Sequence, residues 1–136
     1  MSFSDERAAI ESRFSANWTT TDIKRDGVPF TQPDNDTAWV AITIENASEE
    51  ETTIGSNARH VFRGNIIVQV FTPPHAGSDL ARQYADTIAT IWRRQEFSSG
   101  SSGTIWCRTP GIRVIGETDG WYQINVVTEY ERHVTY

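Results

Sequence analysis

Cysteine is almost absent from this sequence: Cys107 is the single one among 136 residues. One thiol can form no internal disulfide and no zinc site made of several cysteines. We therefore expect a protein that folds in a reducing compartment, with neither a covalent cross-link nor a bound metal.

Positive charge is also scarce, because 12 lysines and arginines face 18 aspartates and glutamates, for a formal net charge of −6. General binding to nucleic acid or to an anionic membrane requires a basic surface, so this balance disfavours both functions. The first residues, MSFSDERAAIESRF, include no continuous apolar stretch. They predict neither a signal peptide nor a membrane-spanning helix.

Enzyme motifs are missing as well. The chain has no GxSxG nucleophile elbow, no GxxxxGK[ST] phosphate loop and no GxGxxG dinucleotide fingerprint. His60, His75 and His133 lack the close spacing of metal ligands, and Cys107 has no adjacent histidine to activate it. We expect no catalytic residue and no cofactor, although a small cytosolic enzyme that uses a carboxylate cleft or Cys107 stays an alternative.

What the sequence does contain is enough apolar material for a packed core. Hydrophobic residues make up 38% of the chain and aromatic residues 11%. At this length we expect a single domain over residues 1–136. The segment SSGSSG, residues 98–103, offers no large apolar side chain, and we expect it to form a flexible loop within that domain.

Two segments have the apolar spacing of amphipathic helices. Residues 2–18 place Ile10, Phe14 and Trp18 four residues apart, with Ser4 as the expected N-cap. Residues 77–97 are expected to begin at a Ser78 cap and to carry Arg93 and Arg94 in the last turns, where positive charge complements the helix dipole. Their apolar stripe consists of Leu80, Tyr84, Ile88, Ile91 and Trp92.

Three other segments, residues 39–45, 59–72 and 121–134, alternate side chains as β-strands do. We expect one or two short strands over residues 104–118, interrupted at Pro110–Gly111, and a tight turn at Asp119–Gly120. Residues 19–38 and the acidic run at 49–51 read as loops. The order predicts an α+β fold: a two-layer sandwich with an antiparallel or mixed β-sheet and two main helices packed on it.

The strand patterns leave apolar residues on a second face of the sheet, among polar neighbours. If even-numbered residues of these strands face the core, the odd-numbered ones face the opposite way. Either another part of the same chain covers this second face, or another copy of the protein does. The apolar residues concerned are Trp39, Ile67, Phe71, Trp121 and Val127.

Several segments, taken in order, match a known pattern: MSFSDERAAIESRFSANW, GVPFTQP before WVAITI, IIVQVFTPP, ADTIATIWRRQEF and CRTPGIRVIGETDGWYQINVVTEYER. They resemble the tail terminator proteins of long-tailed, siphovirus-like bacteriophages, which are small tail-completion proteins. The likeness covers essentially the whole chain. Its most specific part is RRQEF, followed by CRTP and GWYQINV.

The resemblance implies a structural virion protein that assembles as a ring, preferably a hexamer, at the head-proximal end of the tail. Such a ring stops polymerisation of the tail tube and offers a surface for head joining. The implied partners are other copies of the chain, the tail tube protein and a head–tail connector or completion protein. DNA would pass through the lumen without specific binding, no membrane is involved, and assembly would take place in the host cytoplasm.

A ring built from identical subunits needs two different lateral surfaces on each subunit, because its contacts are heterologous. The acidic segment of Glu49, Glu50 and Glu51 and the basic pair Arg93 and Arg94 are candidate complementary contacts, which would guide the register of assembly. The second strand face is the other candidate interface, and we assign to it Trp39, Arg63, Ile67, Trp121 and Gln123.

The nearest alternative is another head–tail connector or neck completion protein, because those proteins share the ring symmetry and the size. Binding to the end of the tail tube would separate the two functions.

Overall fold

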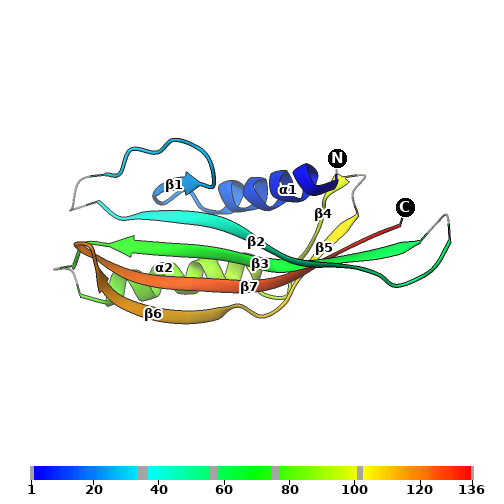
Figure 1. Ribbon diagram of the computed structural model, residues 1–136. Coiled ribbons are helices and arrows are strands. Elements are labelled where there is room, and N and C mark those ends of the chain that lie inside the picture. Colours follow the sequence, from blue (N-terminus) through cyan, green and yellow to red (C-terminus); the bar gives the residue numbers. More distant parts are fainter. Residues whose placement is uncertain (1, 34–36, 56–57, 75–76, 101–102, 136) are drawn as a thin grey trace.

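The structure is a computed structural model that describes residues 2–33, 37–55, 58–74, 77–100 and 103–135 (Figure 1). The described residues form an α+β fold with two helices and seven strands. The elements in chain order are α1 (Ser2–Asn17), β1 (Asp22–Arg25), β2 (Trp39–Glu51), β3 (Arg59–Thr72), α2 (Asp79–Trp92), β4 (Glu96–Ser98), β5 (Thr104–Cys107), β6 (Gly111–Thr118) and β7 (Trp121–Thr135).

The strands form one curled, mixed sheet in the order β1-β2-β3-β7-β5-β4, with β6 paired to β7 beside that path. The β1–β2 pair is parallel, and all the other pairs are antiparallel. On its free side β7 is paired twice: its first half with β6 and its second half with β5. As a result, β1 and β6 lie at opposite edges of the same end of the sheet (Figure 1).

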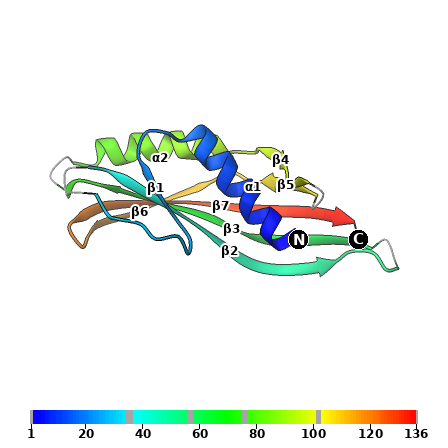
Figure 2. The same cartoon turned by 90° about the horizontal axis from the view of Figure 1, so that it is seen from above.

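One apolar core joins both helices to the sheet. Figure 1 shows α2 behind β3 and β7, and Figure 2 shows α1 running obliquely with its C-terminal half near α2. At that crossing the Phe14 and Trp92 rings stack with their centroids 6.0 Å apart. The predicted stripe of α1, the C-terminal part of the predicted stripe of α2 and the even-numbered strand face are confirmed, since the cluster includes Ile10, Phe14, Trp18, Val40, Ile42, Ile66, Val68, Val70, Ile88, Ile91, Trp92, Ile124, Val126 and Tyr130. Of the other residues predicted for the α2 stripe, Tyr84 packs at the border of the cluster and Leu80 is not part of it. Neither described helix is long and apolar enough to cross a lipid bilayer.

The helix ends differ from the sequence prediction. Helix α1 already begins at Ser2, so Ser4 lies inside the helix and is not its N-cap. Ser78 stands at the N-cap of α2, but its side chain makes no capping hydrogen bond. The same helix ends at Trp92, so Arg93 and Arg94 follow the helix instead of forming its last turns. Arg94 has a positive φ of 55°, which turns the chain away from the helix axis.

Two short strands, β1 and β4, were missed in the sequence. Strand β1 lies within the expected loop 19–38 and has a single apolar residue, Ile23. Strand β4 lies in the segment assigned to the end of the second helix. By contrast, the predicted break at Pro110–Gly111 is confirmed because β6 begins at Gly111. The predicted turn at Asp119–Gly120 is also confirmed, with both residues at positive φ, as a type I′ hairpin requires.

Part of the segment expected as a flexible loop forms the turn between β4 and β5. Ser99 is buried, and its backbone N–H donates to the Gly103 carbonyl at 2.8 Å. Gly103 has a φ of 94°, and a Cβ there would lie 2.0 Å from the His133 carbonyl oxygen, so only glycine fits. Residues 101 and 102 lie outside the described chain, and flexibility of the whole segment 98–103 stays a prediction.

A second, smaller cluster corrects the assignment of Trp39 and Trp121 to an exposed face. The Trp121 side chain is 3% exposed and that of Trp39 is 7% exposed. The Phe71 ring stacks on Trp39 with centroids 4.2 Å apart, and the Phe30 ring, from the segment between β1 and β2, packs on Trp39 at 5.2 Å. The indole rings of Trp39 and Trp121 meet edge-on at 6.0 Å. The same chain therefore covers this end of the second face.

A buried carboxylate fastens the first turns of α1 to the sheet. Glu6 and Arg132 are both almost fully buried, and the Arg132 Nε donates to Glu6 Oε2 at 2.7 Å. The Tyr130 hydroxyl donates to Glu6 Oε1, and the Asn46 amide donates to the same oxygen at 2.9 Å. Burial and the adjacent Glu6 carboxylate raise the pKa of Tyr130 well above its ordinary value, which keeps the phenol protonated as a donor.

Replacing Trp121 with alanine should lower the free energy of unfolding by about 3–5 kcal/mol, because it opens a cavity in the second cluster. Urea denaturation of the monomer measures this loss. Trp106→Ala is the matched control: Trp106 is 50% exposed, and the change should cost no more than about 0.5 kcal/mol. Equal effects of the two substitutions would show that Trp121 is not a core residue.

Replacing Glu6 with leucine should cost about 3–5 kcal/mol, because it removes the carboxylate that offsets the buried Arg132 charge. The double variant Glu6→Leu/Arg132→Met should be more stable than Glu6→Leu alone, since it removes both charges together. Unfolding free energies of Glu6→Leu, Arg132→Met, the double variant and the wild type measure the coupling. Additive losses would contradict a direct Glu6–Arg132 interaction.

Candidate assembly surface

The outer face of the sheet, which we define as the odd-numbered residues of β3 and β7 and the β2 residues that pair with them, changes character along the strands. At one end Trp39, Phe71 and Gln123 lie in one cross-strand row, and all three are covered or partly covered. Gln123 is buried, and its amide donates to Asn125 Oδ1 at 2.8 Å. The predicted surface residue Gln123 is thus a poor candidate for a contact with a neighbouring subunit.

The middle of the outer face carries a small apolar row. Ile67 pairs with Thr43 of β2 and with Val127 of β7, and its side chain is partly buried. Ile67 remains on the face to which the sequence assigned it. It is flanked by polar rows, so its apolar area is limited.

The far end of the outer face is a network of charges centred on Arg63. Its guanidinium donates to Glu50 Oε2 at 2.7 Å and to Glu131 Oε1 at 3.0 Å. Burial of Glu131 opposes its ionisation, but hydrogen bonds from His133, Arg63 and Arg108 outweigh burial and lower the pKa of Glu131. The bond to Glu50 and then the bond to Glu131 raise the pKa of Arg63. The charged side chains at this end of the face therefore have their partners within the same chain.

The acidic run Glu49–Glu51 was expected as a solvated loop; its residues are exposed, as expected, but they are the last three of β2 and not a loop. Strand β3 supplies their partners, His60 and Arg63. The Glu49 carboxylate lies 3.0 Å from His60 Nδ1, and the Glu51 carboxylate lies 3.7 Å from His60 Nε2. All three carboxylates therefore have partners within their own chain. Their contact with Arg93 and Arg94 of a neighbouring subunit stays a prediction.

Arg93 and Arg94 are exposed, and neither guanidinium forms an ion pair with another part of the described chain. Arg94 lines an open hollow of about 520 Å³ together with Arg59, Arg108 and the half-exposed Trp106. Glu96 and Glu131 line the same hollow, and Arg93 does not. Sequence reasoning found Arg94 but missed Arg59, Trp106 and Arg108, because they come from β3, β5 and the β5–β6 connection.

Strand β6 is the most apolar exposed part of the described chain. Ile112, Val114 and Ile115 are 45%, 44% and 43% exposed, and β6 is hydrogen-bonded to a strand of its own chain only on the β7 side. A bulge interrupts the pairing between Val114 and Gly116. Sequence reasoning recognised the strand but not its exposure. The available signal was GIRVI, which is apolar on both faces.

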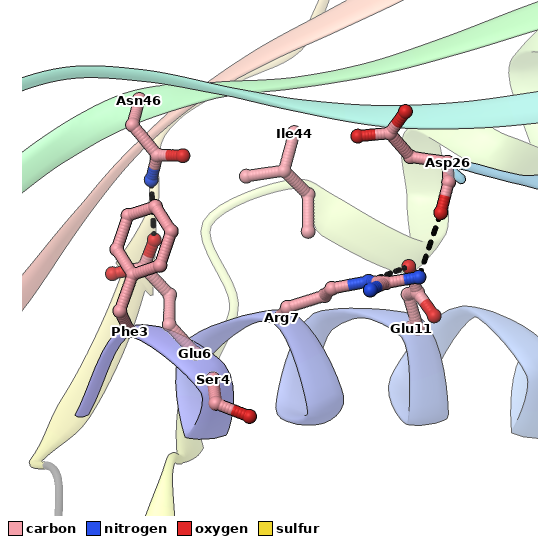
Figure 3. Close-up of a pocket in the computed structure, with 8 residues that line it drawn as sticks. All are labelled: Phe3, Ser4, Glu6, Arg7, Glu11, Asp26, Ile44 and Asn46. Atoms are coloured by element: carbon pink, nitrogen blue, oxygen red, sulfur yellow. Dashed lines mark hydrogen bonds and ion pairs between the residues drawn. The ribbon is translucent and has the colours of Figure 1, made fainter. Parts of the chain in front are cut away.

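A second hollow, of about 330 Å³, lies between α1 and β2 (Figure 3). Phe3 and Ile44 form its apolar part, while Glu6 is turned towards Asn46. The Arg7 guanidinium donates to Glu11 at 2.8 Å and to the Asp26 carbonyl at 2.7 Å. The charged side chains of Arg7 and Glu11 are thus engaged with each other, and Glu6 is engaged with Asn46.

Three of the four reactive residues considered from the sequence, Cys107, His60 and His133, lie in the described part of the chain. Burial raises the pKa of Cys107 to about 12, so the thiol carries almost no thiolate near neutral pH. His60 and His133 contact glutamates, and His75 lies outside the described residues. Within the described ranges, no group of three or more histidine, cysteine, aspartate or glutamate side chains could hold a metal ion.

Comparison with solved structures finds the same fold elsewhere. One solved protein, which has no functional name, is 21% identical; the match covers 97% of this chain and 96% of that chain, with a TM-score of 0.74. A chain from the virion of a native gene transfer agent particle is 16% identical, with 93% of each chain covered and a TM-score of 0.57. No curated protein sequence gives a significant match.

The family model described as phage tail terminator protein matches residues 7–130, which is most of the chain. That match includes both helices except the first residues of α1, and all strands except the last residues of β7. It confirms the resemblance drawn from the sequence segments. The chain therefore belongs to the phage tail terminator family, a family of structural proteins of the phage tail.

Proposed function

We propose that this protein is a tail terminator that forms a ring, preferably of six subunits, on the head-proximal end of the tail tube. The ring stops tube polymerisation and provides the surface to which a head–tail connector or completion protein binds. The observation that carries the proposal is the family match over residues 7–130. The shared fold with a chain of a gene transfer agent virion supports assembly with other virion proteins.

The shape of the subunit suits this role. In the proposal it is a two-layer subunit, with helices on one face and the sheet edges available to neighbours. Two different edges are what a heterologous ring contact requires. The net charge of −6 would weaken adhesion of DNA as it passes through the lumen, because binding to phosphates depends on basic contacts. The protein would assemble in the host cytoplasm and then remain in the virion tail.

Two other functions make different demands on the structure. A neck or connector completion protein would bind the portal side and leave tube growth unchanged. A small enzyme would need a reactive group in a cleft, whereas Cys107 is protonated, and Arg7, Glu11 and Glu6 of the hollow beside α1 have partners within the chain. The structure thus favours an assembly role, and an enzyme is the weaker alternative.

Purified protein should halt the growth of tubes assembled from the tail tube protein of the same phage. Electron microscopy would measure tube length with and without the protein, and a gold label would mark its position. We expect shorter tubes that carry the label at one end only. Unchanged tube growth, with binding to the connector instead, would favour the neck function.

Charge reversal at Arg93→Glu/Arg94→Glu should weaken subunit association without lowering the unfolding free energy, because neither side chain forms an ion pair within the described chain. Light scattering at two salt concentrations measures the association. Arg63→Glu is the control: it breaks two ion pairs within the subunit, so it should reduce stability. If Arg93→Glu/Arg94→Glu associates as the wild type does, these arginines lie outside the interface.

A further inference from the structure

The two strand edges at one end of the sheet have matching lengths and directions. Strand β6 makes four consecutive regular pairs with β7, from Gly111 to Val114, before the bulge. Strand β1, at the opposite edge, is four residues long, from Asp22 to Arg25. Each of these strands is hydrogen-bonded to the sheet on one side, which leaves the backbone groups of the other side available to a further strand.

The strand directions allow one subunit's sheet to continue into the next. Strand β1 is parallel to β2, and three antiparallel pairings lead from β2 through β3 and β7 to β6. Strand β6 therefore runs opposite to β1. Neighbouring subunits of a ring are related by a rotation about the ring axis. If that axis runs along the strands, the rotation leaves the strand directions unchanged, so β6 of one copy would lie antiparallel to β1 of the next.

The two edge strands also lie at the same position along the strand direction. Successive cross-strand partners in β7, β3 and β2 connect Val114 of β6 to Ile23 of β1. In the same way they connect Arg113 of β6 to Lys24 of β1. Neighbouring copies would thus bring β6 and β1 together with little shift along the strands. A shift of two residues avoids placing Arg113 against Lys24, since like charges directly opposite each other destabilise a strand pair.

We propose that β6 of one subunit pairs antiparallel with β1 of a second copy, with Arg113 opposite Asp22 and Ile112 opposite Ile23. This inference rests on the proposed ring function and names its lateral contact. Arg113 and Asp22 are exposed charges of opposite sign on the outer face. On the other face Ile23 packs at the border of the main core, so the neighbour's Ile112 extends that core across the boundary.

The exposed apolar residues of β6 favour a second copy as the occupant of this edge. Ile112 and Val114 alternate with Arg113, so the strand offers apolar side chains on one face and a cation on the other. The β1 edge offers the complement, with Ile23 between Asp22 and Lys24. A two-fold β6–β6 contact would place the apolar residues together as well, but it would end at a dimer and could not close a ring.

Disulfide trapping tests this contact, because directly opposed residues of an antiparallel pair lie within the Cα separation that a disulfide needs. Arg113→Cys and Asp22→Cys proteins are purified separately, mixed and oxidised, with light scattering of each mixture before oxidation. The native Cys107 is 6% exposed and stays protonated, so the wild type should not cross-link. Arg113→Cys mixed with Ile54→Cys is the control, since Ile54 is 98% exposed but lies between β2 and β3.

The mixture of Arg113→Cys and Asp22→Cys should give dimers that contain one chain of each kind. The variant that carries both substitutions should give a ladder of oligomers that ends at the closed ring. Rings that form without this cross-link, or self-linked Arg113→Cys dimers, would overturn the β6–β1 contact while leaving the terminator function standing. A protein that neither associates in solution nor halts tube growth would contradict the proposed function itself.

Discussion

Glu6 holds a negative charge beneath the first turns of α1, where Arg132 and Tyr130 of β7 both donate to it. The rest of the subunit depends on this contact, because it fixes the beginning of the chain to the strand that organises the sheet. The same strand, β7, pairs with β3 on one side and with β5 and β6 on the other. Because Asn46 of β2 also donates to Glu6, this one carboxylate fixes α1 to the strands on both sides of β3.

The sequence predicted the elements whose signal lies within a continuous segment. The stripe of Ile10 and Phe14 in α1, the even-numbered core face of the long strands and the Asp119–Gly120 turn are all confirmed. What could not be predicted depends on contacts between distant segments. Trp121 packs edge-on against Trp39, which Phe30 and Phe71 contact from two other segments. A glutamate near the beginning of a helix, such as Glu6, ordinarily serves the helix dipole, and no local pattern indicates its contact with Arg132.

The candidate interface, too, could be predicted only where its signal lies within a continuous segment. Alternation placed the odd-numbered residues of β3 and β7 on the outer face correctly, but it did not predict the β2 bulge after Asn46, which moves Glu50 onto that face. Alternation also does not say which part of a face its own chain covers. Three carboxylates that read as a free acidic patch have partners on β3, because β2 continues through Glu51. The exposed edge of β6 depends on the order of strands in the sheet, which no local pattern specifies. The surfaces through which such a protein would bind its neighbours are thus sheet edges and faces that only the complete fold defines.

The most direct test of this account is the structure of the ring bound to the end of its tail tube, at a resolution that separates strands. We expect one β-sheet to run across every subunit boundary, with β6 antiparallel to β1 of the adjacent copy. A ring in which β6 faces solvent, or in which the helices alone make the lateral contacts, would contradict it.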